Sequence, residues 1–109
     1  MKQIQIYSVI RERHDIPYVN TLAPLDGVFV QVSDHRESWV SQWKWWRCKD
    51  QPMRRTVENR RVFLVNSLAQ AIGLRWDNTK EVVVCLDGDF LNCRDENIAL
   101  LPLEEVVAQ

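Results

Sequence analysis

Five tryptophans in a chain of 109 residues place the strongest constraint on how the chain can fold. Each buried Trp removes roughly 150–250 Å² from water, so a domain of this size has room for one core built around them. Trp39 and Trp43 are four residues apart, the spacing that places side chains on one face of a helix. Trp45 and Trp46 are adjacent in a predicted strand and point to opposite sides. We expect Trp39, Trp43 and one of the adjacent pair in the core, leaving the other to stack on a base or fill a partner's pocket.

Turn signals divide the chain into short segments, among them Asp26-Gly27, Asn59-Arg60 and Asp87-Gly88. Apolar and β-branched runs predict strands at 1–10, 28–32, 45–48, 53–58, 61–65 and 82–86. Capping and stop residues predict helices at 35–43, 67–72 and 94–101. The polar stretch 11–24, which contains two prolines, is predicted to be a loop.

The order of these elements predicts an α+β fold. We expect a small antiparallel three-stranded sheet with helices, followed by a ββα core. Residues 1–24 are predicted to form an N-terminal arm or strand, and residues 25–109 a single domain. Within that domain we expect a basic sheet module at 25–66 and the ββα-like core at 67–101.

Composition excludes several classes of protein. No run approaches the ~18 apolar residues that a membrane span needs, and the start Met1-Lys2-Gln3 lacks a signal-peptide pattern. We therefore expect no membrane partner. The three cysteines form no Cys-x-x-Cys pair, which indicates a reducing cytoplasm rather than a disulfide framework.

The net charge of −1 conceals two oppositely charged blocks. Residues 36–61 carry eight basic and three acidic side chains, whereas residues 77–105 carry two basic and eight acidic ones. The blocks are explained equally well by two solvated faces and by a basic surface that meets a polyanion.

The segment 82–101, VVVCLDGDFLNCRDENIALL, resembles the ββα-metal core of the HNH nuclease family, in the form V-D-H-I-D-G-D-x-L-N-N-R-x-E-N-L. The matching residues are Val83, Leu86, Asp87, Gly88, Asp89, Leu91, Asn92, Arg94, Glu96 and Asn97, with Ile98 in place of Leu. The segment 62–73 resembles the strand and helix that precede this core, and the Trp-rich and basic segments before it resemble the sheet module of the phage and homing-endonuclease branch. The resemblance covers about residues 25–101 and is specific in the last twenty.

The resemblance implies a degenerate active site. The family places a metal-ligand Asp and a general-base His where this chain has Val84 and Cys85. Asn92 and Asn97 remain as vestigial site residues, but one neutral amide does not hold Mg²⁺ against hydration. Cys85 and Cys93 lack the spacing of a zinc site, and Asp87 and Asp89 are expected to shape the turn. We expect no metal and no cofactor, with Mg²⁺ needed only if the chain is a weak nuclease.

Three functions follow from this interpretation. The first is non-catalytic binding of duplex DNA, the second is a phage or mobile-element protein that inhibits or regulates a host protein, and the third is a weak HNH endonuclease. The candidate nucleic-acid-binding residues are Lys44, Arg47, Lys49, Arg54, Arg55, Arg60 and Arg61. The candidate protein-binding residues are Trp45, Trp46, Asp89, Asp95 and Glu96.

Overall fold

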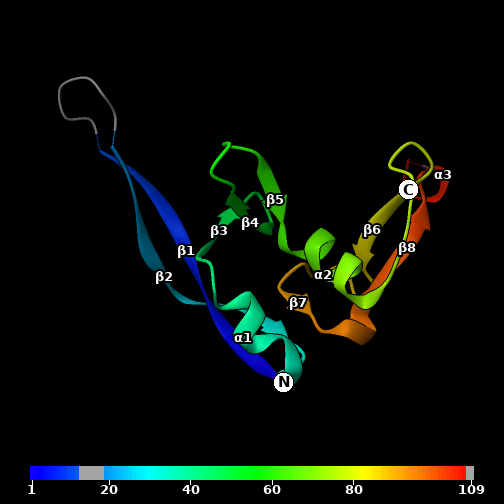
Figure 1. Cartoon of the computed structure of the whole chain (residues 1–109), viewed down its shortest axis with the longest axis horizontal. Coiled ribbons are helices and arrows are strands. Elements are labelled where there is room, and N and C mark those ends of the chain that lie inside the picture. Colours follow the sequence, from blue (N-terminus) through cyan, green and yellow to red (C-terminus); the bar gives the residue numbers. More distant parts are fainter. Residues whose placement is uncertain (13–18, 108–109) are drawn as a thin grey trace.

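The fold is built mostly of β-strands (Figure 1). The computed structural model describes residues 1–12 and 19–107. Its strands are β1 (Lys2–Glu12), β2 (Val19–Val32), β3 (Trp45–Cys48), β4 (Gln51–Arg55), β5 (Arg61–Phe63), β6 (Glu81–Cys85), β7 (Asn92–Cys93) and β8 (Ile98–Pro102). Its helices are the 3₁₀ turns η1 (Asp34–Arg36) and η2 (Asp95–Asn97) and the α-helices α1 (Glu37–Val40), α2 (Leu64–Ile72) and α3 (Leu103–Val107).

Six strands form one curled mixed sheet in the order β5-β4-β3-β1-β2-β7, and β6 and β8 form a separate pair. The predicted α+β class, with a small three-stranded sheet, is therefore wrong. The three strands β3, β4 and β5 are present as an antiparallel unit, but β3 also pairs with β1 in parallel through Ile6↔Trp45 and Tyr7↔Trp46. A parallel pair between segments almost forty residues apart leaves no local signal in the sequence.

Two predicted elements differ from the structure in kind. The predicted helix at 94–101 is a single 3₁₀ turn followed by strand β8, because Ile98–Leu101 pair residue by residue with Val82–Cys85 of β6. The predicted loop at 11–24 is wrong for residues 11–12, which end β1, and for residues 19–24, which lie in β2, while residues 13–18 lie outside the described residues. The predicted helix at 35–43 shortens to η1 and the single turn α1.

Local signals elsewhere predict the elements well. The strand predicted at 45–48 is β3 with the same bounds. The predicted helix at 67–72 lies within α2, which ends where Gly73 adopts a left-handed conformation, with φ of 100°. That conformation is the usual helix end for glycine, which has no Cβ to clash.

The core contains Trp39, Trp43 and Trp45, as expected, and Trp76 also packs against it. Trp45 is fully buried, and Trp39 and Trp43 pack against the core with edge-to-face contacts that link Trp39 to Trp43 and Trp43 to Trp45. The Trp45 indole N–H donates to the carbonyl oxygen of Val40 at 2.9 Å, which satisfies its one polar group. The other buried core residues are Ile6, Val30, Val32, Val40, Leu64, Val65, Leu68, Ala69, Val83, Cys85, Cys93 and Ile98.

Arg54 belongs to this aromatic cluster. Its guanidinium carbon lies 4.2 Å from the ring centre of Trp43 and 5.6 Å from that of Trp45. Its Nε is buried and has no hydrogen-bond partner within the described residues. The side chain therefore contributes to stability through cation–π contact and packing.

We expect Arg54→Ala to lower the free energy of unfolding by about 1–2 kcal/mol, because it removes a cation from the faces of two rings. The adjacent and exposed Arg55 is a matched control, whose replacement by Ala is expected to change stability by less than about 0.5 kcal/mol. Urea denaturation followed by circular dichroism measures both values. Equal effects of the two substitutions would contradict a structural role for Arg54.

Candidate nucleic-acid interface

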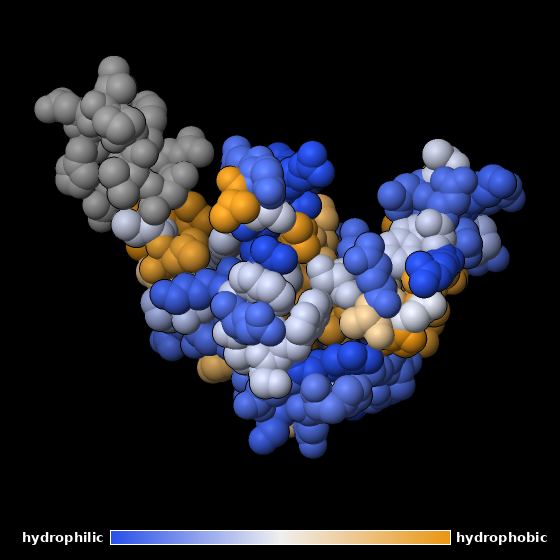
Figure 2. Space-filling view, in the orientation of Figure 1, coloured by the Kyte–Doolittle hydropathy of each residue, from blue (hydrophilic) through white to orange (hydrophobic). Residues whose placement is uncertain are grey.

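The exposed cations of the predicted interface lie on the unit formed by β3, β4 and β5 and on its turns, whose outer end is strongly hydrophilic in Figure 2. We call this set the basic surface, and its members are Lys44, Arg47, Lys49, Arg55, Arg60 and Arg61. Arg54, the seventh predicted residue, is partly buried on the tryptophans instead. Two of these side chains are held by carbonyl oxygens, since Arg47 Nε donates to Lys49 O at 3.1 Å and Arg55 Nη1 to Asn59 O at 2.9 Å.

The basic surface has few carboxylates to neutralise it. Within the described part of the chain, its one ion pair joins Arg47 Nη2 to Asp50 Oδ1 at 3.7 Å, and the Asp50 side chain is 88% exposed. An exposed pair of this kind contributes little to stability, so its cation remains available to another anion.

The strand register places a row of large side chains on the face of the sheet opposite Trp45, and one of them, Met53, is itself buried. Tyr7 of β1 is opposite Trp46 of β3, which is opposite Met53 of β4, which is opposite Phe63 of β5. Trp46 is only partly buried, so it is the accessible member of the predicted Trp45–Trp46 pair. On this same face Arg55 is opposite Arg61, so cations and aromatic rings share one side of the sheet.

Three cavities lie along β5 and α2. The first, of about 300 Å³, is bounded by the β3–β4 turn, Phe63 of β5 and Phe90. The second, of about 260 Å³, lies between β5 and α2, where Arg61, Asn66 and Gln70 reach it.

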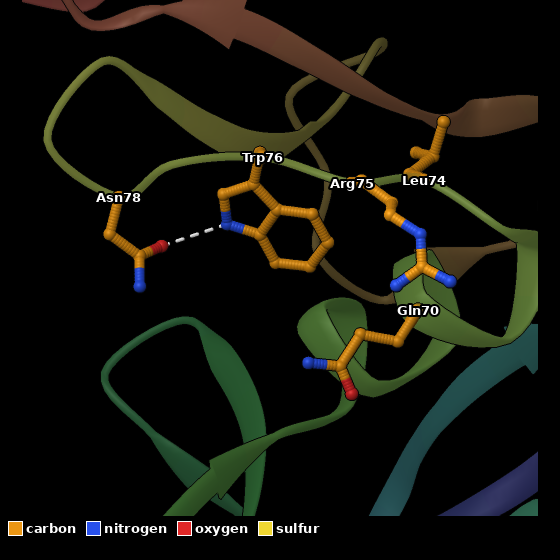
Figure 3. A pocket seen from close by; sticks show the side chains of 5 residues that line it. All are labelled: Gln70, Leu74, Arg75, Trp76 and Asn78. Carbon is orange, nitrogen blue, oxygen red and sulfur yellow. Dashed lines mark hydrogen bonds between the residues drawn. The ribbon is translucent and has the colours of Figure 1, made fainter.

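The third cavity, of about 420 Å³, lies between the C-terminal end of α2 and the segment before β6 (Figure 3). Gln70 reaches it from the helix, and Arg75, Trp76 and Asn78 reach it from the segment. The indole N–H of Trp76 donates to Asn78 Oδ1 at 2.8 Å, which fixes how the ring is presented. Sequence reasoning missed this site, because the lining residues follow no motif and Trp76 stands apart from the Trp-rich segment.

The loop that resembles the HNH core is organised around Asp87. Its carboxylate accepts hydrogen bonds from Asn97 Nδ2 at 2.9 Å, Asn92 Nδ2 at 2.8 Å and the backbone N–H of Asp89 at 2.9 Å. These bonds, of which that from Asn97 has the largest effect on the pKa, lower the pKa of Asp87 from 3.8 to about 2. Asn97 Nδ2 also donates to the carbonyl oxygen of Asn92 at 2.7 Å. Both predicted vestigial amides thus hold the turn together.

The two positions at which the HNH resemblance would place the catalytic pair lie on β6. Val84 is partly buried and Cys85 is buried in the core. The thiol of Cys93 has a pKa well above its usual range, because it is hydrogen-bonded to Cys85 and buried. Among the described residues, no group of three or more His, Cys, Asp or Glu side chains is close enough to hold a metal ion.

The candidate protein-binding residues differ in burial and in the contacts that they make. Trp45 is in the core, whereas Asp89 and Glu96 are exposed. Asp95 is partly buried and engaged, because Arg36 Nη2 and His35 Nε2 both lie 3.1 Å from its Oδ2. Trp45, which is buried, is therefore not accessible to a partner protein.

No protein-family model, curated protein or solved structure matches this chain. Within the described residues, no helix has the length and apolar character needed to cross a bilayer.

Asp87→Asn is expected to destabilise the protein at neutral pH, because the substitution removes a charged acceptor of three hydrogen bonds. A carboxyl whose folded pKa lies below its unfolded value stabilises the fold above the unfolded pKa, and this contribution disappears as pH falls through the folded pKa. The difference in melting temperature between wild type and variant should therefore shrink between pH 4 and pH 2.

Thermal melts at a series of pH values measure this difference. Asp26→Asn, at an exposed carboxyl in the turn before Gly27, is the control and should follow the wild type throughout. If the difference in melting temperature between the wild type and Asp87→Asn stays constant down to pH 2, this result would show that Asp87 does not organise the loop.

Proposed function

We propose that this protein binds duplex DNA without cleaving it, using the basic surface of β3, β4 and β5. The observation that carries the proposal is the concentration of six exposed Lys and Arg side chains on one sheet unit, with one ion-paired carboxylate among the described residues. Long cationic side chains at strand ends and turns reach phosphates while their charges stay in water. A non-catalytic role is supported by the chemistry at 84–85, where Val and a buried Cys stand in place of an oxygen ligand and a base.

The charge distribution supports an oriented approach to a polyanion. Acidic side chains dominate residues 77–105, so the molecule presents a positive unit and a negative unit. A field of this kind steers the positive unit towards DNA and keeps the negative unit away from it. The same proposal places the protein in a reducing cytoplasm, in keeping with three free cysteines.

Salt titration is the direct test of phosphate contacts. The affinity for duplex DNA should fall steeply with salt, with a slope of about −0.9 in log K against log[salt] for each phosphate neutralised. Arg60→Ala combined with Arg61→Ala should weaken binding and reduce the size of that slope by about 2. Lys80→Ala, at an exposed cation before β6, is the matched control and should leave both quantities unchanged. Absence of binding at ~50 mM salt would refute the proposal.

We expect the protein to leave supercoiled plasmid intact in the presence of Mg²⁺ or Mn²⁺. Conversion to nicked circles, measured on agarose gels, would contradict the non-catalytic part of the proposal if chelation with EDTA abolished it. Retention of DNA binding without nicking would support a purely binding role.

A second candidate function is regulation of a host protein through the acidic segment 77–105. One observation favours it: Leu86 is 63% exposed and adjoins Asp87, with Asp89 close by in the same turn. An apolar anchor surrounded by carboxylates suits a basic protein surface of the kind that binds DNA. A protein that fails to bind DNA at low salt would make this turn the better-supported site.

A further inference from the structure

The three cavities along β5 and α2 form one groove. Arg61 and Phe63 line both the first and the second cavity, and Gln70 lines both the second and the third. The surface is visibly hollowed between the β3–β5 unit and the segment that leads to β6 (Figure 2). The groove therefore runs from the β3–β4 turn, along the junction of β5 with α2, to Trp76.

Aromatic rings occur at both ends of this groove. Phe63 and Phe90 border the cavity beside the β3–β4 turn, and Trp76 borders the cavity at the far end of α2. All three side chains are only partly buried, and those of Phe90 and Trp76 also pack against the core, so each of these two rings offers a ligand only its exposed part. In Figure 3 the Trp76 ring extends from its segment towards the helix that carries Gln70. Partly exposed rings in a groove provide faces on which flat, apolar groups can stack.

The charges along the groove favour an anion. Lys49, Arg61 and Arg75 line it, against the single carboxylate of Asp50, which already lies 3.7 Å from Arg47. The three cations are distributed along the groove instead of meeting at one point. This spacing suits a chain that carries a negative charge at regular intervals.

Amide side chains complete the lining. Gln51, Asn66 and Gln70 each present one acceptor and two donors, and none of them makes a side-chain hydrogen bond within the described part of the chain. Such groups can bond to the edges of nucleobases, which present donors and acceptors together.

We infer that the groove binds a single-stranded segment of nucleic acid, with bases on Phe63 or Phe90 and on Trp76 and phosphates at Arg61 and Arg75. The inference rests on the proposed nucleic-acid binding and adds the form of the ligand. A duplex conceals the faces of its bases, so rings inside a groove contribute stacking only when the strand is unpaired. Arg61 belongs to both the basic surface and the groove, so an unpaired strand can leave a duplex bound on β3–β5 and enter the groove there.

The test compares a labelled single strand of ~15 nucleotides with a blunt duplex of the same length, by fluorescence anisotropy with the full-length protein. Trp76→Leu should weaken single-strand binding roughly tenfold, since each stacked base contributes strongly to affinity, and should leave duplex binding unchanged. Circular dichroism melts establish that the variant is folded.

A second variant keeps the test decisive if Trp76→Leu fails to fold. Gln70→Glu adds a carboxylate at an exposed helix position where two of the cavities meet. Ala71→Glu adds the same charge at the next exposed position of α2, outside the groove lining. We expect Gln70→Glu to weaken single-strand binding several-fold more than Ala71→Glu.

The outcomes separate the two proposals. If the protein binds duplex with the expected salt dependence but Gln70→Glu and Ala71→Glu reduce single-strand binding equally, the groove inference is overturned and the proposed function stands. If neither ligand binds at ~50 mM salt, both are overturned. Selective loss of single-strand binding in Trp76→Leu and Gln70→Glu supports the groove.

Discussion

The parallel pairing of β1 with β3 is the contact on which the rest of the structure depends. Among the described residues this ladder consists of the two pairs Ile6↔Trp45 and Tyr7↔Trp46, yet it joins the β3–β5 unit to the β1–β2–β7 part of the sheet. So short a ladder needs support from side chains, and Ile6 and Trp45 supply it because both are completely buried. The indole N–H of Trp45 is satisfied by Val40 O, which also fixes α1 against the join.

Because successive side chains of a strand point to opposite faces, neighbouring residues of the same type have different roles in this sheet. Trp45 fills the core while Trp46 lies on the opposite face with Tyr7 and Phe63. Arg54 stacks on core tryptophans while Arg55 is exposed beside Arg61. Because the side-chain period of a strand is two, a shift of register by one residue would exchange these roles and bury a cation without a partner. The aromatic core therefore also fixes which cations face solvent.

A short strand, a helix end and the tryptophan core were predictable from the sequence, whereas the pairing of strands far apart in the chain was not. The strand at 45–48, the helix stop at Gly73 and the tryptophan core all followed from spacing and turn residues. The strand at Ile98–Pro102 was mistaken for a helix, since an apolar run after Asp95 and Glu96 fits a helix start equally well until its partner β6 is known. The groove was not predictable because its lining comes from β5, α2, the β3–β4 turn and two further loops, which contain Phe90 and Trp76. The resemblance to HNH nucleases stays a prediction, although the role of Asn92 and Asn97 in bracing the loop agrees with a purely structural use of that motif.

The separation of positive and negative units has a consequence for the protein in concentrated solution. A net charge of −1 provides almost no overall repulsion between copies. The basic residues of 36–61 in one molecule and the acidic residues of 77–105 in another are complementary, so they can attract one another either reciprocally in a closed pair or head to tail. Salt weakens such contacts, because dissolved ions screen the attraction between exposed charges.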